Sequence, residues 1–308
     1  MVQHALIKAG LLLAASTSTM AGPLNAGTDE HYDDLVYRFP LPDFQTQSEP
    51  VYPEIIPVPR DFVPDKDYFG NLTATQGPTV RRGIIGADDR FQWDGTEFPF
   101  KPIGRVTFVD NTGQGSLCSG ALIGPRHVLT ARHCIGDGSF NGRFAPSFLK
   151  GERFGSAGVV GAITDPDYAN YPYLSECWIK NDYAILILDQ RIGDQTGYLF
   201  LASNPDPATL GQPELNTCGY PGDKDGGGSK WCQYRRTPTR IGGCDSTGPV
   251  STDIDAVGGQ SGSVVWDQAA DGSVWIWGVL SVSSATETVM ASGSQMLLGW
   301  QFAMTNWP

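Results

Sequence analysis

The sequence lacks the features that metal sites and polyanion binding require. Only 21 lysines and arginines stand against 33 aspartates and glutamates, so the formal net charge is −12 at pH 7. Proteins that bind nucleic acid or anionic membrane surfaces carry basic faces, so neither partner is expected. The four histidines are scattered, and no two cysteines form a Cys-x-x-Cys pair. The sequence therefore predicts no metal site, and no cofactor is expected.

Long apolar runs are also missing. The run from Ala9 to Ala15 follows Lys8 and is too short to span a bilayer, and small residues come after it. This order is typical of a secretory signal peptide, which we assign to residues 1–26. An N-terminal helix is the alternative, but six cysteines, an even number, favour disulfides in an oxidising compartment. We expect a secreted, extracellular protein.

The next segment, residues 27–82, is rich in proline and acidic residues. Such a composition buries little apolar surface and is typical of extended or disordered chain. The segment ends in the dibasic pair Arg81–Arg82. We interpret it as a propeptide with activation cleavage between Arg82 and Gly83, and a plain linker is the alternative. The prolines stand at positions 40, 42, 50, 53, 57, 59, 64 and 78.

From residue 83 onward, short apolar runs alternate with turn residues. The chain holds 38 glycines and 22 prolines, which favours an all-β fold over a helical one. A short helix is expected near the end, over residues 296–304. The runs that predict strands are 103–109, 118–123, 127–131, 184–188 and 274–280.

A glycine-rich stretch, residues 258–263, places Ser261 where glycines surround it. Its sequence is Gly-Gly-Gln-Ser-Gly-Ser, which predicts a tight turn with accessible backbone amides. Ser261 could act as a nucleophile there. The amides of Gly259 and Ser261 could then form an oxyanion hole for an acyl-transfer intermediate. Taken alone, such turns are mostly ordinary loops.

Two upstream stretches supply the partners that a nucleophilic serine needs. His133 ends an apolar run, and Asp182 comes directly before another. A serine needs a base to take its proton, and the base needs a carboxylate to fix its tautomer. The order His133, Asp182, Ser261 is that of chymotrypsin-type proteases. It differs from the orders of subtilisins and of α/β-hydrolases, which excludes a lipase or esterase of that kind.

Four stretches together carry a family resemblance. The chain resembles the trypsin-like (chymotrypsin-fold) serine proteases over residues 83–308, and within them the glutamyl endopeptidase branch that includes V8 protease. The resemblance implies two antiparallel six-stranded β-barrels with a short C-terminal helix. The first, residues 83–195, would hold His133 and Asp182, and the second, residues 196–308, would hold Ser261. The matching stretches are 84–90, 118–134, 219–224 and 258–263.

The resemblance also implies roles for the site residues and one disulfide. His133 would be the general base, Asp182 would orient it, and Ser261 would form the acyl-enzyme. The spacing of Cys118 and Cys134 matches the family disulfide that closes the loop carrying the histidine. The other four cysteines allow three connectivities. A hairpin-like segment between them favours Cys218–Cys232, which leaves Cys177–Cys244.

The substrate pocket departs from the glutamyl branch at two positions. Leu280 stands where that branch has a histidine, and Ala256 stands where it often has a hydroxyl residue. A buried substrate carboxylate without a donor is costly, so glutamate should not dominate before the scissile bond. Asp255 stands where trypsin keeps its pocket aspartate. A basic or an apolar preference is expected, with no choice between them.

The residues after Leu280 are expected to bind the substrate backbone. Ser281 matches the serine that supports the triad aspartate, while Val282 and Ser283 would pair with an extended peptide. An ordinary strand is an equal alternative for this segment. The expected partners are therefore polypeptide substrates, and a monomer is expected.

One residue favours a second hypothesis. Arg132 precedes the histidine, where the family usually has a small residue. The alternative function is a catalytically impaired protease homologue that acts as a binding module. The intact triad favours the other hypothesis, a secreted serine endopeptidase.

Overall fold

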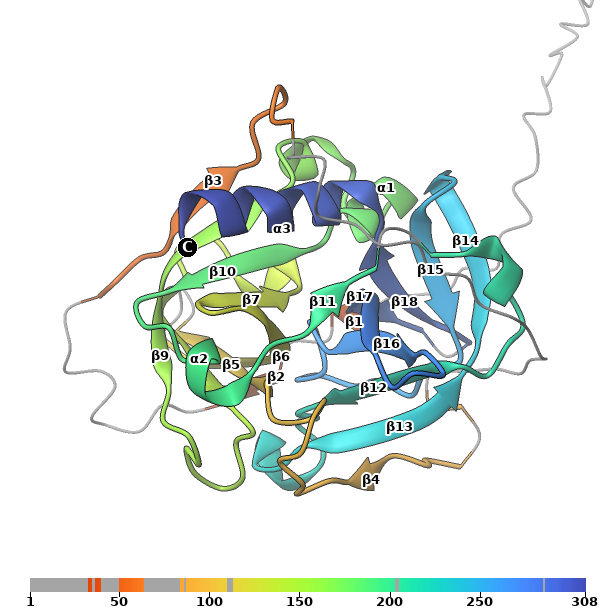
Figure 1. Ribbon diagram of the computed structural model, residues 1–308, viewed down its shortest axis with the longest axis horizontal. Coiled ribbons are helices and arrows are strands. Elements are labelled where there is room, and N and C mark those ends of the chain that lie inside the picture. The colour runs from red at the N-terminus through yellow and green to blue at the C-terminus, as the bar shows by residue number, and fades with distance from the viewer. Residues whose placement is uncertain are drawn as a thin grey trace, which may run out of the picture. The chain divides into compact units, whose positions relative to one another are not determined.

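The computed structural model describes residues 33–34, 37–39, 50–63, 84–85, 87–109, 113–202, 205–284 and 286–308. The predicted signal peptide and the predicted cleavage site between Arg82 and Gly83 lie outside the described residues. Within the described part of the chain, no helix is long and apolar enough to cross a membrane. Most of the regular structure is β-strand, in two sheets (Figure 1).

The first sheet closes on itself. Its strands follow the order β10-β7-β6-β5-β8-β9, and β9 pairs again with β10. All of these pairings are antiparallel, so six strands form a closed barrel. The strands are β5 (Ile103–Val109), β6 (Gly115–Gly124), β7 (His127–Thr130), β8 (Phe140–Pro146), β9 (Ala157–Thr164) and β10 (Ala184–Leu188).

Strand β10 shows why these residues make a central strand. All five of its side chains are buried. Successive side chains of a strand point to opposite faces. Leu186 and Leu188 accordingly belong to one hydrophobic cluster, and Ile185 and Ile187 belong to another that includes the C-terminal helix. Each fully buried aliphatic side chain contributes about 1.5–3 kcal/mol relative to exposure.

The second sheet contains the remaining long strands. Its order is β14-β15-β18-β17-β16-β12-β13, followed by the short β4 (Phe91–Gln92), and β11 (Phe200–Leu201) pairs in parallel with β17. A single residue, Thr237, separates β13 from β14 in the chain. The long strands are β12 (Leu215–Gly219), β13 (Trp231–Arg236), β14 (Pro238–Asp245), β15 (Gly248–Thr252), β16 (Val264–Gln268), β17 (Val274–Ser283) and β18 (Thr288–Ser292).

Strand β4 lies in the second sheet although the sequence analysis assigns its residues to the first barrel. It pairs with β13, with Phe91 opposite Cys232. The Phe91 ring meets the Tyr234 ring edge-on at 5.0 Å between centroids. Aromatic contacts of this kind contribute beyond the area that they bury. The chain therefore crosses the second sheet before it enters the first barrel.

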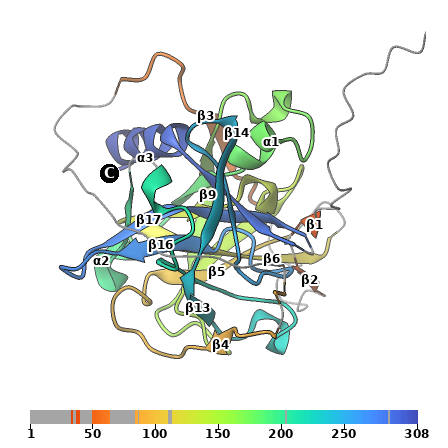
Figure 2. The same cartoon turned by 90° about the vertical axis from the view of Figure 1, so that its right-hand side faces the viewer.

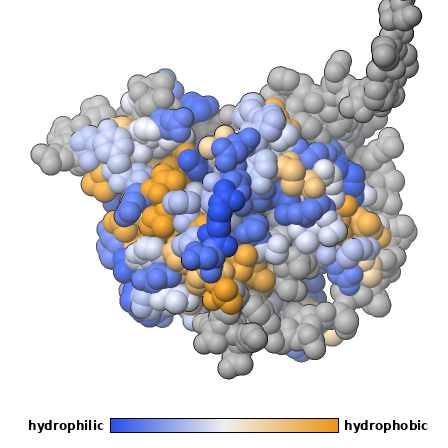
Figure 3. Space-filling model, turned by 90° about the horizontal axis from the view of Figure 1, so that it is seen from above, coloured by the Kyte–Doolittle hydropathy of each residue, from blue (hydrophilic) through white to orange (hydrophobic). Residues whose placement is uncertain are grey.

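The C-terminal helix α3 (Ser294–Asn306) contains the residues 296–304 that were predicted as helix. It lies along β10 in Figure 1. Trp300 is buried and donates from Nε1 to the carbonyl of Ile123 at 2.8 Å. The helix thus continues from the second sheet and packs on the first barrel. Seen from above, apolar and polar residues are interspersed over the described surface (Figure 3).

The other helical segments are short. Two are α-helices, and both follow or precede strands of the first barrel. The segments are η2 (Arg132–Cys134), η3 (Tyr168–Asn170), α1 (Glu176–Lys180), α2 (Gly193–Thr196), η4 (Pro207–Thr209) and η5 (Asp225–Gly227).

Part of the proline-rich segment is packed, contrary to the expectation that it buries little. Strand β3 (Glu54–Pro57) pairs in parallel with β9, at the end of the first sheet's strand order. Val58 is buried in the core, and Phe62 packs edge-on against Phe302. Prolines are tolerated at a sheet edge, where one side of the strand needs no partner. Composition averaged over the segment hides this short apolar run.

Two further strands come from the same segment. Strand β1 (Asp33–Asp34) pairs with β17, and β2 (Tyr37–Phe39) pairs with β6. The prediction of an all-β fold with a short C-terminal helix is confirmed: of the two predicted six-stranded barrels, the first closes with six strands, and the other long strands of the described residues form the second sheet. The predicted strands at 103–109 and 184–188 have the bounds of β5 and β10.

Candidate active site

The two sheets bring three predicted residues together. His133 lies in η2, directly after β7, and Asp182 precedes β10. Because β7 and β10 pair with Thr130 opposite Ala184, both residues lie at the same end of that ladder. Ser261 comes from the turn between β15 and β16. The His133 Nδ1–Asp182 Oδ2 distance is 2.5 Å, and the His133 Nε2–Ser261 Oγ distance is 2.6 Å.

The carboxylate of Asp182 is fully buried and accepts four hydrogen bonds. Besides the imidazole, its donors are the backbone amide of His133 at 2.8 Å, Ser281 Oγ at 2.6 Å and the hydroxyl of Tyr168 at 3.2 Å. Burial and the charge of Asp182 raise the pKa of Tyr168, so its hydroxyl stays protonated and donates. A buried charge is tolerated only when it is satisfied in this way. The imidazole is thereby held in one orientation.

The turn that carries Ser261 needs glycine at two positions. Gly259 and Gly262 have φ values of +98° and +77°, which disfavour other residues. A Cβ atom at Gly262 would lie 2.1 Å from Thr130 Oγ1. Ser119 of β6 holds the turn: its amide donates to the Ser261 carbonyl and its Oγ to the Gly259 carbonyl, both at 2.8 Å.

The amides of this turn divide into two groups. Those of Gln260, Gly262 and Ser263 donate to backbone carbonyls at 2.8–3.0 Å. Those of Gly259 and Ser261, the predicted oxyanion donors, have no acceptor among the described residues. Two such amides beside a nucleophile are the donor arrangement that stabilises an oxyanion.

Three disulfides support the site, and they join the pairs that the sequence analysis favours. Cys118–Cys134 ties β6 to η2, and therefore to His133. Cys177–Cys244 joins α1, just before Asp182, to β14 of the second sheet. Cys218–Cys232 links directly opposed residues of β12 and β13. A native disulfide typically contributes about 2–4 kcal/mol.

The predicted pocket aspartate is occupied by protein groups. Asp255 is buried and accepts from the amide of Ile85 at 2.5 Å and from Gln233 Nε2 at 3.0 Å. The same Gln233 nitrogen donates to Asp89 at 2.7 Å. Burial, together with the charge of Asp89, raises the pKa of Asp255 to about 6. Ala256 and Leu280, the other two pocket residues, are buried and apolar.

The two residues that were predicted to pair with the substrate backbone already pair with strands of the protein. Val282 lies opposite Asp34 of β1, and Ser283 lies opposite Asp33. Their other edge pairs with β18. Both residues therefore form a paired strand, and the strand on their outer edge comes from the proline-rich segment.

Arg132 is held by a backbone carbonyl and an aromatic ring. Its Nη1 donates to the carbonyl of Ile135 at 2.5 Å, and its guanidinium lies over the Tyr168 ring, 5.4 Å from the centroid. The long side chain that departs from the family pattern is therefore accommodated by neighbouring groups.

Sequence reasoning missed two residues at the site. Trp178 stacks on His133, with 6.2 Å between ring centroids and 24° between planes. Arg90 is buried and donates to Gln260 Oε1 at 2.9 Å, directly beside the nucleophile. Two features of the sequence could have indicated them: Trp178 follows a cysteine, and Arg90 ends one of the stretches that carry the family resemblance.

Arg90 has the geometry of a positioning residue. Two carboxylates, Asp88 and Asp223, hold its guanidinium at 2.6–3.1 Å. The Gln260 oxygen that it reaches also accepts from the amide of Val257 at 3.0 Å. Arg90 thus links the chain at residue 90 to the residues directly before the nucleophile.

We expect Arg90→Met to lower kcat/KM about 10- to 100-fold, because the turn loses a charge-assisted hydrogen bond of about 1.5–3 kcal/mol. Lys224→Met is the matched control. Lys224 also pairs with Asp88, at 2.8 Å, and among the described residues its ammonium makes no hydrogen bond to Gln260 or the turn. Steady-state kinetics and melting temperatures of the two variants are compared with those of the wild-type protein. Equal losses of activity in the two variants would contradict the positioning role.

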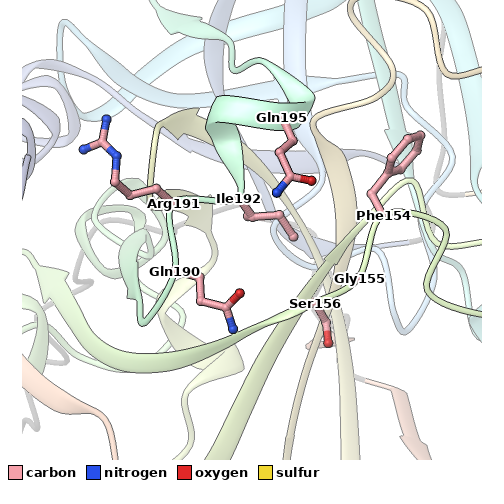
Figure 4. Close-up of a pocket in the computed structure, with 7 residues that line it drawn as sticks. All are labelled: Phe154, Gly155, Ser156, Gln190, Arg191, Ile192 and Gln195. Atoms are coloured by element: carbon pink, nitrogen blue, oxygen red, sulfur yellow. The ribbon is translucent and has the colours of Figure 1, made fainter.

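A separate pocket lies away from this site. It is lined by Phe154, Gly155, Ser156, Gln190, Arg191, Ile192 and Gln195 (Figure 4). None of these residues belongs to the triad or to the nucleophile turn. Among the described residues, no group of three His, Cys, Asp or Glu side chains could hold a metal ion.

Comparisons with solved structures support the fold. The structure of a Glu endopeptidase in complex with MPD matches with a TM-score of 0.59 and 24% identity, over 72% of this chain and 100% of that chain. A thermostable serine protease, AL20, matches with a TM-score of 0.54 and 22% identity, over 67% of this chain and 98% of that chain. At these identities the similarity shows the fold alone.

Sequence relatives include proteases and a protein named as an inactive protease. The glutamyl endopeptidase of Bacillus licheniformis is 30% identical over 210 residues, or 67% of this chain and 61% of the relative. Mouse serine protease 23 is 25% identical over 50% of this chain and 44% of the relative. Rat inactive serine protease 35 is 37% identical over 27% of this chain and 18% of the relative. This chain thus spans less than two thirds of each relative's length.

The family model named trypsin-like peptidase domain matches residues 118–274, about half of the chain. That range begins at the cysteine tied to the histidine loop and contains all three residues of the hydrogen-bonded triad. The expected resemblance is therefore confirmed, and the chain belongs to the trypsin-like peptidases.

Proposed function

We propose that this protein is a secreted serine endopeptidase that forms its acyl-enzyme on Ser261. One observation carries the proposal: Asp182, His133 and Ser261 form a continuous hydrogen-bonded chain with distances of 2.5 and 2.6 Å. The family membership supports peptide substrates. The signal peptide, the activation cleavage after Arg82, and action as a monomer without nucleic acid or membrane partners belong to the same proposal.

The geometry supports a defined sequence of proton and acyl transfers. His133 takes the Ser261 proton as Oγ attacks the substrate carbonyl, and later gives it to the leaving amine. Asp182 holds the imidazole and stabilises its charged form. The amides of Gly259 and Ser261 donate to the oxyanion. Water then hydrolyses the acyl-enzyme in a second round with the same base.

The alternative function is a binding module that has lost catalysis. It draws support from the similarity to inactive serine protease 35 over part of the chain. The hydrogen-bonded triad supports the peptidase instead. A fluorophosphonate probe distinguishes the two, because it labels only a serine that its neighbours activate.

The specificity is proposed to be apolar rather than glutamate- or lysine-directed. Leu280 and Ala256 offer no donor to a substrate carboxylate, and both oxygens of Asp255 already accept hydrogen bonds from the protein. A substrate side chain with a charge would lose its hydration without gaining a partner.

Cleavage of a peptide library by the secreted protein measures this preference. We expect leucine and similar apolar residues before the scissile bond, and fewer cuts after Glu, Lys or Arg by at least about tenfold. A majority of cuts after Glu would mean that another group receives the carboxylate. A majority after Lys or Arg would mean that Asp255 exchanges its present partners for the substrate.

A further inference from the structure

The chain between β9 and β10 leaves the first barrel and packs on the second sheet. Its helix α1, the last regular element before Asp182, lies beside β14 in Figure 2 and contacts β14, β15 and β18. Trp178 and Ile179 of this helix share a hydrophobic cluster with side chains of β17 and β18. The helix that leads to Asp182 is therefore held by the sheet whose β15–β16 turn carries Ser261.

Two adjacent links fasten this helix to β14. Cys177 forms a disulfide with Cys244. At the next position of β14, Asp245 Oδ2 accepts a hydrogen bond from the Lys180 ammonium at 2.6 Å. We call these two links the α1–β14 clamp. The disulfide restricts how far the helix can move from the strand, and the ion pair adds a charge-assisted contact at the last residue of the helix.

Lys180 fits the second sheet closely. Its side chain is 4% exposed, whereas that of Asp245 is 49% exposed. Glycines leave room for its aliphatic stem: a Cβ atom would lie 3.0 Å from Lys180 Cε at Gly293 and 3.4 Å from Lys180 Cγ at Gly248. Burying an ammonium group is costly, and a buried ion pair is often no more stabilising than an apolar contact of similar volume. Stability alone therefore gives little reason for a lysine here, which favours a role in positioning.

The helix contacts both upstream members of the triad. The backbone amide of Asp182 donates to the Ile179 carbonyl at 3.2 Å. The Trp178 ring stacks on the His133 ring with 6.2 Å between centroids. A shift of α1 would therefore displace the carboxylate and the imidazole relative to Ser261, and a misplacement of about 1 Å can lower a rate by about 100-fold.

We infer that Lys180 is a positioning residue, whose ion pair with Asp245 keeps α1 on the second sheet and the triad aligned. The inference rests on the peptidase function proposed above. Within the described part of the chain, the Lys180 ammonium bonds to Asp245 and to no member of the triad, so its effect passes through the helix. Its loss should lower kcat, which depends on alignment in the transition state, and leave KM nearly unchanged.

Lys180→Met is the variant that removes the charge and keeps an aliphatic stem. Methionine fits a space that already holds such a stem. The carboxylate of Asp245 stays half exposed and keeps two donors from Thr247, the amide at 2.8 Å and the hydroxyl at 2.7 Å. We therefore expect a folded protein, which the melting temperature and the circular dichroism spectrum verify.

The first test compares the steady-state kinetics of Lys180→Met with those of a matched control, Arg240→Met. Arg240 of β14 pairs with Glu176 of α1 at 3.0 Å, but the two side chains are 40% and 42% exposed, and exposed pairs contribute little. With a peptide that the secreted wild-type protein cuts, we expect Lys180→Met to lower kcat about 10- to 100-fold and to change KM less than about twofold. Arg240→Met should change kcat less than about twofold.

A double-mutant cycle tests the ion pair itself. Asp245→Asn removes the anion and leaves Lys180 in place, and it serves as the second variant if Lys180→Met does not fold. If the two side chains act as one unit, Asp245→Asn and the double variant should each lower kcat to the same extent as Lys180→Met, within about twofold. Losses that multiply in the double variant would show two independent effects and overturn the inference.

A second measurement reads the alignment of the triad without substrate. The His133 Nδ1–Asp182 Oδ2 distance is 2.5 Å, and a proton in so short a hydrogen bond gives a separate low-field NMR signal in protein with isotope-labelled histidine. We expect this signal in the wild-type protein and in Arg240→Met, and its broadening or loss in Lys180→Met. A lower stability alone would leave the signal of the folded protein unchanged.

The outcomes separate this inference from the peptidase function. Wild-type kcat in folded Lys180→Met, or equal losses in Lys180→Met and Arg240→Met, overturns the inference and leaves the peptidase function standing. A loss that appears only in KM, or an NMR signal unchanged in Lys180→Met, overturns it as well. A wild-type protein that cuts no peptide contradicts the peptidase function, and the NMR signal alone then decides whether Lys180 positions the triad.

Discussion

Ser261→Ala is expected to lower kcat/KM by about 10⁴- to 10⁶-fold, because the substitution removes the atom that forms the acyl-enzyme. The lost Oγ is 2.6 Å from His133 Nε2 and is buried, so no solvent group replaces it. The change is measured with a peptide that the secreted wild-type protein cuts.

The same variant should keep its fold. Alanine fits the space of serine, and the turn keeps its backbone bonds from Ser119 and to Leu280. We therefore expect a melting temperature within a few degrees of wild type, since one hydrogen bond contributes about 1 kcal/mol. An inactive variant that is also unfolded would leave the nucleophile untested, so Ser261→Cys serves as a second variant. Near wild-type turnover in folded Ser261→Ala would contradict the assignment.

Asp182→Asn is expected to lower kcat about 10⁴-fold with a much smaller effect on KM. An amide nitrogen at the position of Oδ2 would donate to His133 Nδ1, which forces the ring proton onto Nε2. In that tautomer the imidazole cannot accept the proton of Ser261. The expected loss is therefore in the chemical step. Steady-state kinetics, which gives kcat and KM separately, measures it.

Tyr168→Phe is the matched control for Asp182. It removes one of the four donors to the carboxylate, the hydroxyl at 3.2 Å, and leaves the charge in place. We expect a loss below about tenfold, because one longer hydrogen bond contributes about 0.5–1.5 kcal/mol. Comparable losses in both variants would show that packing around Asp182, and not the tautomer of His133, controls the rate.

The triad could be predicted from the sequence because each member has a local signal. Ser261 lies in a glycine-rich turn, His133 adjoins a cysteine, and Asp182 precedes an apolar strand. The order of the three along the chain then excludes the other hydrolase types. Strand β10 was predicted with its bounds because five apolar residues between turns have few other structures available.

Other features depend on contacts between distant segments, which no local pattern reveals. Arg90 and Gln260 are 170 positions apart, and nothing in the sequence of either indicates the other. The sequence made Asp255 a candidate for binding basic substrate side chains, because it shows where Asp255 stands along the chain but not which groups contact its carboxylate. Its partners, Ile85 and Gln233, become visible only in the fold.

The proline-rich segment shows a different limit. Its composition predicts chain that buries little, and composition is an average over many residues. A few residues within it, such as Val58 in the core and Phe39 against Gly115, nevertheless make packing contacts. Strand pairing at a sheet edge uses backbone groups, so it leaves almost no trace in the sequence.

The central claim is that Ser261 is an activated nucleophile, and one labelling experiment tests it most directly. The secreted protein is treated with a fluorophosphonate probe, digested and analysed by mass spectrometry, with His133→Ala as the control. The account predicts a single adduct on Ser261 in the wild-type protein and labelling at least about a hundredfold slower in His133→Ala. No adduct on Ser261 in folded protein that has lost the segment before residue 83 would contradict the account, and would favour a binding module.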